Sequence, residues 1–352
     1  MLLTQQLLSE TIRVSTLGVT LLPGESMTKA YLYFHSPCFD GLVSAVLASD
    51  FLEKQYAWQF DNFLPVDYQS REAWLPSALN GPAAVVDFLY HPQATFWADH
   101  HSTTFLTPEA RRDFDQRSNE NLLLYNDRFG SCAQLLWEET ERLFGFRNWQ
   151  YSDLVDWADK IDAARYSSVE EAILGDTPAL RIKAFIGLCN DSSCLTRLVL
   201  QLKTSSLEEV ANAADISKVY KVVRSRTLAG LKRFKGNVWL EDDDIVVFDV
   251  ESHHVMVSRY APYHFFPDAR YSVGILRFGR GVKITAMRNP WREFRSVRLG
   301  NIFQKYGGGG HDRVASLLLP YERVDDAKIL LHRIVADIRI ENAALGVLRR
   351  TA

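Results

Sequence analysis

In the first half of the chain, short apolar runs alternate with longer segments of helical spacing. The runs YLYF (31–34), PAAVVDFLY (82–90) and TFWADHH (95–101) have the length and apolar content of buried strands. Apolar residues recur at helical spacing after the first run, and the segments 131–144 and 151–164 also predict helices. Strands that alternate with helices favour an α/β fold with a mostly parallel sheet.

The second half predicts a helical connector followed by a smaller α/β domain. Residues 195–235 carry an apolar stripe among many Lys and Arg, whereas 238–288 contains several short strand-like runs and a last helix is expected near 324–341. We therefore expect four parts: an N-terminal extension (1–26), a first domain (27–194), a helical connector (195–235) and a second domain (236–352).

Composition indicates a globular protein in a reducing compartment. The chain has 352 residues, of which 47% are hydrophobic and 24% are charged, as in ordinary soluble domains. No apolar run reaches the roughly 18 residues that a membrane span needs, and the N-terminus lacks the pattern of a signal peptide. The four cysteines form no CxxC pair, so free thiols and a cytoplasmic location are expected, with no membrane partner.

Acidic and imidazole side chains gather where the predicted strands of the first domain end. The set consists of His35, Asp40, Asp87, Asp99, His100 and His101. Ligands collect at the carboxyl ends of parallel strands, so Asp40, Asp87 and His100 could meet in space. One Asp near a strand end is more often a turn or cap residue, but the joint pattern predicts a metal site. Oxygen-rich ligands with imidazole suit Mn²⁺ or Mg²⁺ better than structural Zn²⁺.

Two motifs in this order resemble the DHH phosphoesterase superfamily, which includes RecJ-like exonucleases, nanoRNA and cyclic-dinucleotide phosphodiesterases, and manganese pyrophosphatases. The first is ADHHSTT, preceded by VVDF and HSPCFDGLVSA. The second, VKITAMRNPW followed by GNIFQKYGGGGHDRVAS, is similar to the DHH-associated domain with its GGGH hallmark. The resemblance covers roughly residues 29–345. It implies a DHH metal-binding catalytic domain over 27–194 and a DHH-associated substrate-binding domain over 236–352.

The resemblance also implies a role for each motif residue of the first domain. Asp87 would bridge two Mn²⁺ ions, and Asp40 and His100 would ligate one of them. Asp99 would orient its neighbours, while His101 would lie near the scissile phosphate. A fourth acid would come from the end of the helix predicted over 151–164, either Asp159, which we prefer, or Asp162.

The chain departs from the family at the first motif. Cys38 stands where the family usually has an Asp, two residues before Asp40, and His35 is one residue away from the commonest spacing. A thiolate is a poorer partner for Mn²⁺, so the first metal could be weak, be a different metal, or use His35 and Asp87 with water. The alternative is that Cys38 is a small core residue.

In the second domain, the expected substrate-binding residues are Arg288, Asn289, Gly308, Gly309, Gly310 and His311. Glycines alone would indicate a flexible turn, but here ten Lys and Arg against two acids between 270 and 313 give the window a net charge of +8. That excess favours an anionic ligand. The resemblance implies that the glycine-rich turn, His311 and Arg288 hold a nucleotide or its terminal phosphate.

The leading hypothesis is a hydrolase: a phosphodiesterase that cleaves short oligonucleotides or (cyclic) dinucleotides to mononucleotides. It would use water activated by two Mn²⁺ ions, with Mg²⁺ as the other candidate metal. One alternative is a non-catalytic or weakly catalytic nucleotide sensor, motivated by Cys38. A further alternative is a pyrophosphatase or other small phosphoesterase, against which GGGGH argues. The expected partner is a short nucleic acid or dinucleotide, and a homodimer stays open.

Overall fold

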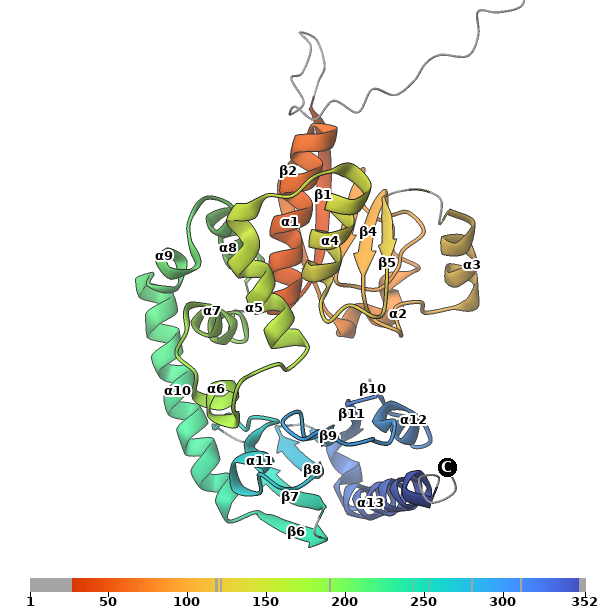
Figure 1. Cartoon of the computed structure of the whole chain (residues 1–352), viewed down its shortest axis with the longest axis vertical. Coiled ribbons are helices and arrows are strands. Elements are labelled where there is room, and N and C mark those ends of the chain that lie inside the picture. Colours follow the sequence, from red (N-terminus) through yellow and green to blue (C-terminus); the bar gives the residue numbers. More distant parts are fainter. Residues whose placement is uncertain are drawn as a thin grey trace, which may run out of the picture. The chain divides into compact units, whose positions relative to one another are not determined.

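The computed structural model describes residues 27–117, 120, 122–189, 191–242, 244–252, 254–279, 281–310 and 312–347 (Figure 1). The predicted extension over 1–26 lies outside the described residues. The chain folds into two compact units. The first unit runs to Val155 and includes Asp191–Thr204, and the second comprises Asp156–Asn190 and the chain from Ser205 onward.

A five-stranded parallel sheet forms the centre of the first unit. Its order is β2 (Trp58–Val66), β1 (Thr28–His35), β3 (Ala83–Val86), β4 (Phe96–Asp99) and β5 (Leu123–Tyr125). The predicted parallel sheet is confirmed, with two strands, β2 and β5, that the sequence patterns did not predict. Because β1 pairs with β2 on one side and β3 on the other, the strand order reverses between β1 and β3. Open sheets bind ligands at this point, beyond the carboxyl ends of the strands.

Helix α1 (Phe39–Tyr56) is the central helix of the first unit. Every residue from Phe39 to Leu52 is buried, as expected for a helix covered on all sides. It packs against α4 (Cys132–Phe144) and α8 (Ser192–Thr204). The unit also contains the short helix α2 (Arg71–Trp74), α3 (Pro108–Arg117) and the beginning of α5 (Ser152–Asp162).

A six-stranded sheet forms the second unit. Its order is β10 (Gly309–Gly310), β11 (Val314–Pro320), β9 (Gly281–Arg288), β8 (Tyr271–Phe278), β7 (Ile245–Glu251) and β6 (Val238–Asp242). All pairs are antiparallel except β7 with β8. The long helix α13 (Val324–Val347) covers one face, where its apolar residues join those of β8, β9 and β11 in a single core.

The remaining helices of the second unit are α6 (Val169–Leu174), α7 (Pro178–Ile186), α9 (Leu207–Ala211), α10 (Ala214–Lys235), α11 (Ala261–Phe265) and α12 (Leu299–Gln304). The segment predicted as a connector is helical, in α8, α9 and α10. Helix α8 packs within the first unit, where Thr196 Oγ1 donates to the carbonyl of Phe63 at 3.2 Å. The domain boundaries at 194 and 235 stay predictions. Among the described helices, none has the length and apolar content to cross a membrane.

Candidate metal centre

The motif residues of the first unit meet at the carboxyl ends of β1, β3 and β4. His35 is the last residue of β1, Asp87 directly follows β3, and Asp99 ends β4. Asp87 adopts a left-handed conformation with φ of 55°, which a non-glycine residue rarely holds unless its surroundings enforce it. Its backbone N–H donates to the carbonyl of Ala98 at 2.9 Å, which fixes the turn. The strained turn places the Asp87 side chain at the point where the strand order reverses.

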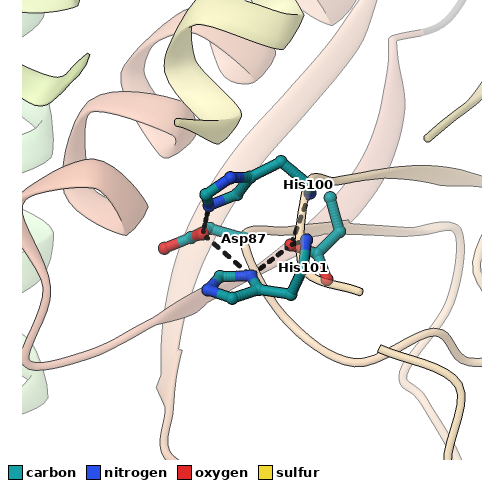
Figure 2. A group of neighbouring side chains, drawn as sticks. Asp87, His100 and His101 are labelled. Carbon is teal, nitrogen blue, oxygen red and sulfur yellow. Dashed lines mark hydrogen bonds and ion pairs between the residues drawn. The ribbon is translucent and has the colours of Figure 1, made fainter. Parts of the chain in front are cut away.

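Asp99 organises the two histidines that follow it. Its Oδ1 accepts hydrogen bonds from the His100 backbone N–H at 2.8 Å and from Nδ1 of His101 at 2.7 Å. The rings of His100 and His101 both approach Asp87 (Figure 2). Burial alone would raise the pKa of Asp99, but the charge and hydrogen bond of His101 hold that pKa below its ordinary value. Asp99 is therefore an ionised, fully buried acceptor, which fits the predicted orienting role.

A backbone carbonyl outside the motif decides which ring nitrogen of His100 carries the proton. Its Nδ1 lies 3.2 Å from the backbone carbonyl of Phe129, and because a carbonyl only accepts, Nδ1 carries the proton. Nε2 is then the nitrogen with a lone pair, and it lies 3.7 Å from Oδ2 of Asp40 and 3.7 Å from Oδ1 of Asp87. A backbone carbonyl behind a histidine is the usual support of a metal ligand. Nothing in the sequence singled out Phe129, because its side chain takes no part.

Asp40 is held by the first turn of α4. Its two oxygens accept the backbone N–H groups of Cys132 at 2.7 Å and Ala133 at 2.9 Å, and the residue is fully buried. Helix N-termini stabilise negative charge, so α4 favours the ionised form of Asp40. Sequence analysis missed this role of α4, although Ser131, which caps the helix by accepting from the Gln134 N–H, marks its start.

The residues present fit a divalent cation. Asp87, Asp99, His100 and His101 each offer one ligand atom, and these atoms all lie within 4.8 Å of one another. His35, Cys38 and Asp87 form an overlapping group on the same criterion. The two carboxylates of the first group, Asp87 and Asp99, are both buried and would repel each other strongly without positive charge between them. Oxygen and imidazole ligands suit Mn²⁺ or Mg²⁺, whereas Cys38 adds a sulfur ligand.

The two acids of α5 belong to the second unit. Asp159 forms an ion pair with Arg165, and burial raises its pKa above the ordinary value despite that pair. Asp162 is the last residue of α5. The preference for Asp159 over Asp162 as the fourth acid stays a prediction.

In the second unit, the glycine-rich turn begins the hairpin of β10 and β11. An added Cβ would lie 2.7 Å from the Ser316 carbonyl at Gly308 and 2.4 Å from the Val314 carbonyl at Gly310, whereas Gly309 has open space. Close backbone packing thus requires Gly308 and Gly310, independently of any ligand. His311 lies outside the described residues.

Arg288 and Asn289 hold the loop that follows β9. The Arg288 guanidinium donates to the carbonyls of Arg292 at 2.9 Å and Phe294 at 3.1 Å. Asn289 is fully buried; its amide donates to the carbonyl of Ala269 at 2.8 Å, and its oxygen accepts the Trp291 N–H. Both side chains therefore have structural partners in addition to the predicted contact with substrate, which stays a prediction.

Solved structures share this fold, whereas no family model and no curated protein matches the sequence. A pGpG-specific phosphodiesterase, PggH, from Vibrio cholerae has a TM-score of 0.63 and 18% identity, over 88% of this chain and 99% of that one. RecJ of Thermus thermophilus in complex with Mn²⁺ has a TM-score of 0.55 and 14% identity, over 88% of this chain and 52% of that one. The RecJ complex with Mg²⁺ has a TM-score of 0.52 and 15% identity, over 88% and 50%. The chain thus spans about half the length of the Thermus thermophilus RecJ chains, and these likenesses show a shared fold.

Proposed function

We propose that this protein is a metal-dependent phosphodiesterase that hydrolyses short oligonucleotides or dinucleotides to mononucleotides. One observation carries the proposal: three buried carboxylates and two oriented imidazoles converge at the strand-order reversal of a parallel sheet. A structural role does not account for this arrangement, because a fold gains nothing from like charges buried side by side. A cation-dependent reaction on an anionic substrate does account for it.

The proposed roles follow from the position of each side chain. Asp87 lies within 3.7 Å of both His100 and His101 and also contacts His35, which supports the proposal that it would be shared by two cations. Asp40 and His100 Nε2 would supply an oxygen and a nitrogen ligand on one side of Asp87. Two bound divalent cations would neutralise the phosphoryl oxygens and supply a nucleophilic water at neutral pH.

His101 is proposed to act on the phosphate. Asp99 accepts the Nδ1 proton of His101 at 2.7 Å, so the hydrogen bond fixes the ring and leaves Nε2 to hold or release a proton. The imidazole can then orient the substrate phosphate and protonate the departing oxygen. An aspartate behind a histidine favours the imidazolium form, which makes that proton available.

Names of the structural neighbours support the substrate class and the metals. One is called a pGpG-specific phosphodiesterase, and RecJ was solved with Mn²⁺ and with Mg²⁺. We therefore propose a linear 5′-phosphorylated dinucleotide as the first substrate to test and Mn²⁺ as the first metal.

A substrate panel tests the proposal. The full chain is assayed with Mn²⁺ or Mg²⁺ on pGpG, a dinucleotide of another base, cyclic di-GMP and pyrophosphate, with the nucleotides separated by chromatography. We expect mononucleotide product from linear dinucleotides and none from Asp87→Asn. Tight nucleotide binding without turnover under either metal would favour the sensor alternative. Phosphate release from pyrophosphate alone would favour the small phosphoesterase.

A further inference from the structure

Cys38 lies beside the proposed metal centre, and its side chain does not cap the helix that it precedes. It precedes α1 as the N-cap residue with extended backbone, and its side chain makes no capping hydrogen bond. Ser, Thr, Asp and Asn are the usual caps, so cysteine brings no advantage there. Cys38 is also partly exposed, in contrast to the fully buried Cys132, so it is not a core residue. Cys38 is therefore neither a helix-capping residue nor a fully buried one.

The geometry around Cys38 is that of a mixed ligand set. One ligand atom from each of His35, Cys38 and Asp87 lies within 4.8 Å of the other two. Nδ1 of His35 is 3.2 Å from Oδ2 of Asp87, so these two already face each other. Asp87 is 1% exposed, which keeps the shared carboxylate away from bulk water. Nitrogen, sulfur and oxygen thus surround one small volume at the end of β1.

The two sides of Asp87 differ in chemistry. On one side lie Asp40 and His100, with only oxygen and nitrogen atoms. On the other lie His35 and Cys38, which add sulfur. Hard ions such as Mn²⁺ and Mg²⁺ prefer oxygen, whereas Zn²⁺ and Co²⁺ bind thiolate and imidazole more strongly. Two ions that shared Asp87 would therefore have different ligand atoms, one with oxygen and nitrogen only and the other with sulfur as well.

We propose that Cys38 is a metal ligand and that, with His35 and Asp87, it forms a cation position selective for thiophilic divalent ions such as Zn²⁺ or Co²⁺ over Mn²⁺. The inference rests on the metal centre proposed above, but it concerns which ion binds and not which substrate is cleaved. The protein would then hold two different metals, with the harder ion on the side of Asp40 and His100.

Cobalt spectroscopy tests the ligand directly. Co²⁺ is titrated into metal-free full-length protein in a buffer without thiols, and the near-ultraviolet absorption is followed. A thiolate bound to Co²⁺ gives an intense charge-transfer band that oxygen and nitrogen ligands do not give. We expect this band in the wild type and in the matched control Cys194→Ser, and its loss in Cys38→Ser. Cys38→Asp should lack the band and bind Mn²⁺ more tightly by about tenfold or more.

Alkylation provides a second measurement that needs no variant. Zn²⁺ should slow the reaction of iodoacetamide with Cys38, followed by peptide mass spectrometry, while the partly exposed Cys189 and Cys194 react at unchanged rates. If Cys38→Ser does not fold, protection of Cys38 by Zn²⁺ in the wild type tests the inference. Bound Co²⁺ without a charge-transfer band, a band that persists in Cys38→Ser, or no protection by Zn²⁺ would overturn the inference. Hydrolysis of dinucleotides is measured separately, so the proposed metal selectivity and the proposed phosphodiesterase function can each be refuted independently of the other.

Discussion

Replacing Gly41 by alanine should disable the metal centre by adding one methyl group. Gly41 lies in the first turn of α1, where a Cβ would be 2.1 Å from the His35 carbonyl oxygen and 3.2 Å from Oδ2 of Asp87. Ordinary van der Waals contact begins near 3.4 Å, so relieving the contact with the carbonyl alone requires a shift of about 1.3 Å. The contact is with backbone, which cannot rotate away.

The expected loss of turnover follows from the backbone shift that the added methyl group would require. Either the end of β1, which carries His35, or the start of α1, which carries Asp40, must shift by more than the roughly 0.5 Å that a catalytic arrangement tolerates. A misplacement of about 1 Å can cost about 10²-fold in rate, so turnover should fall at least about 100-fold. Overpacking should also destabilise the first unit by about 1–3 kcal/mol, and each kcal/mol lowers the Tm by about 2–4 °C.

Calorimetric titration of Mn²⁺, a thermal scan and dinucleotide hydrolysis below the Tm measure these effects. Gly236→Ala is the matched control, since a Cβ there meets nothing within 4 Å. We expect the control to behave as wild type and Gly41→Ala to lose both Mn²⁺ affinity and turnover. Wild-type affinity and turnover in Gly41→Ala would refute the close approach of α1 to β1 that the reasoning needs.

Three further predictions concern single side chains. Asp87→Asn and His100→Ala should each abolish turnover with an unchanged circular dichroism spectrum, and activity retained in both would rule out the proposed centre. His311→Ala should mainly raise the KM for nucleotides; unchanged kinetics would make the glycine-rich turn purely structural. Burial and the nearby carboxylates raise the pKa of the Cys132 thiol well above its ordinary value of 9.0, so the thiol stays protonated in the folded state while the unfolded chain ionises. The free energy of unfolding should therefore fall as the pH rises above about 9, and it should fall less steeply in Cys132→Ala. Urea denaturation from neutral pH to about pH 10 measures this, and an equal dependence of the unfolding free energy on pH in both proteins would contradict it.

Sequence patterns predicted the strands that carry chemistry and missed those at the sheet edges. The strands β1, β3 and β4 are central, and each contains an uninterrupted apolar run (YLYF, AAVV and FWA), so their signal is strong. The edge strand β2 contains Asp61, Asn62 and Pro65, which weaken a strand pattern and are tolerated only because one side of an edge strand is unpaired. The other edge, β5, has only three residues. Because neither edge strand was predicted, the order of the strands in the sheet could not be predicted from the sequence.

The residues of the candidate site were predictable, but their states were not. Asp87, Asp99, His100 and His101 lie in short contiguous motifs, and the turns that follow β3 and β4 place them together. The proton on Nδ1 of His100 depends on the Phe129 carbonyl, 29 residues further along the chain. Contacts of this kind involve backbone atoms, which every residue type provides.

The sequence by itself determined that the first half forms a parallel α/β sheet and which side chains stand at its strand ends, because both follow from local periodicity and local turns. Tertiary structure alone decided that β1 lies between β2 and β3 and that the first turn of α4 donates backbone N–H groups to Asp40. It also decided that Cys38 lies close to His35 and Asp87. These facts depend on the order in which strands pair and on close approach between distant segments. Sequence spacing does not encode either of them, because many pairings would bury the same apolar residues equally well.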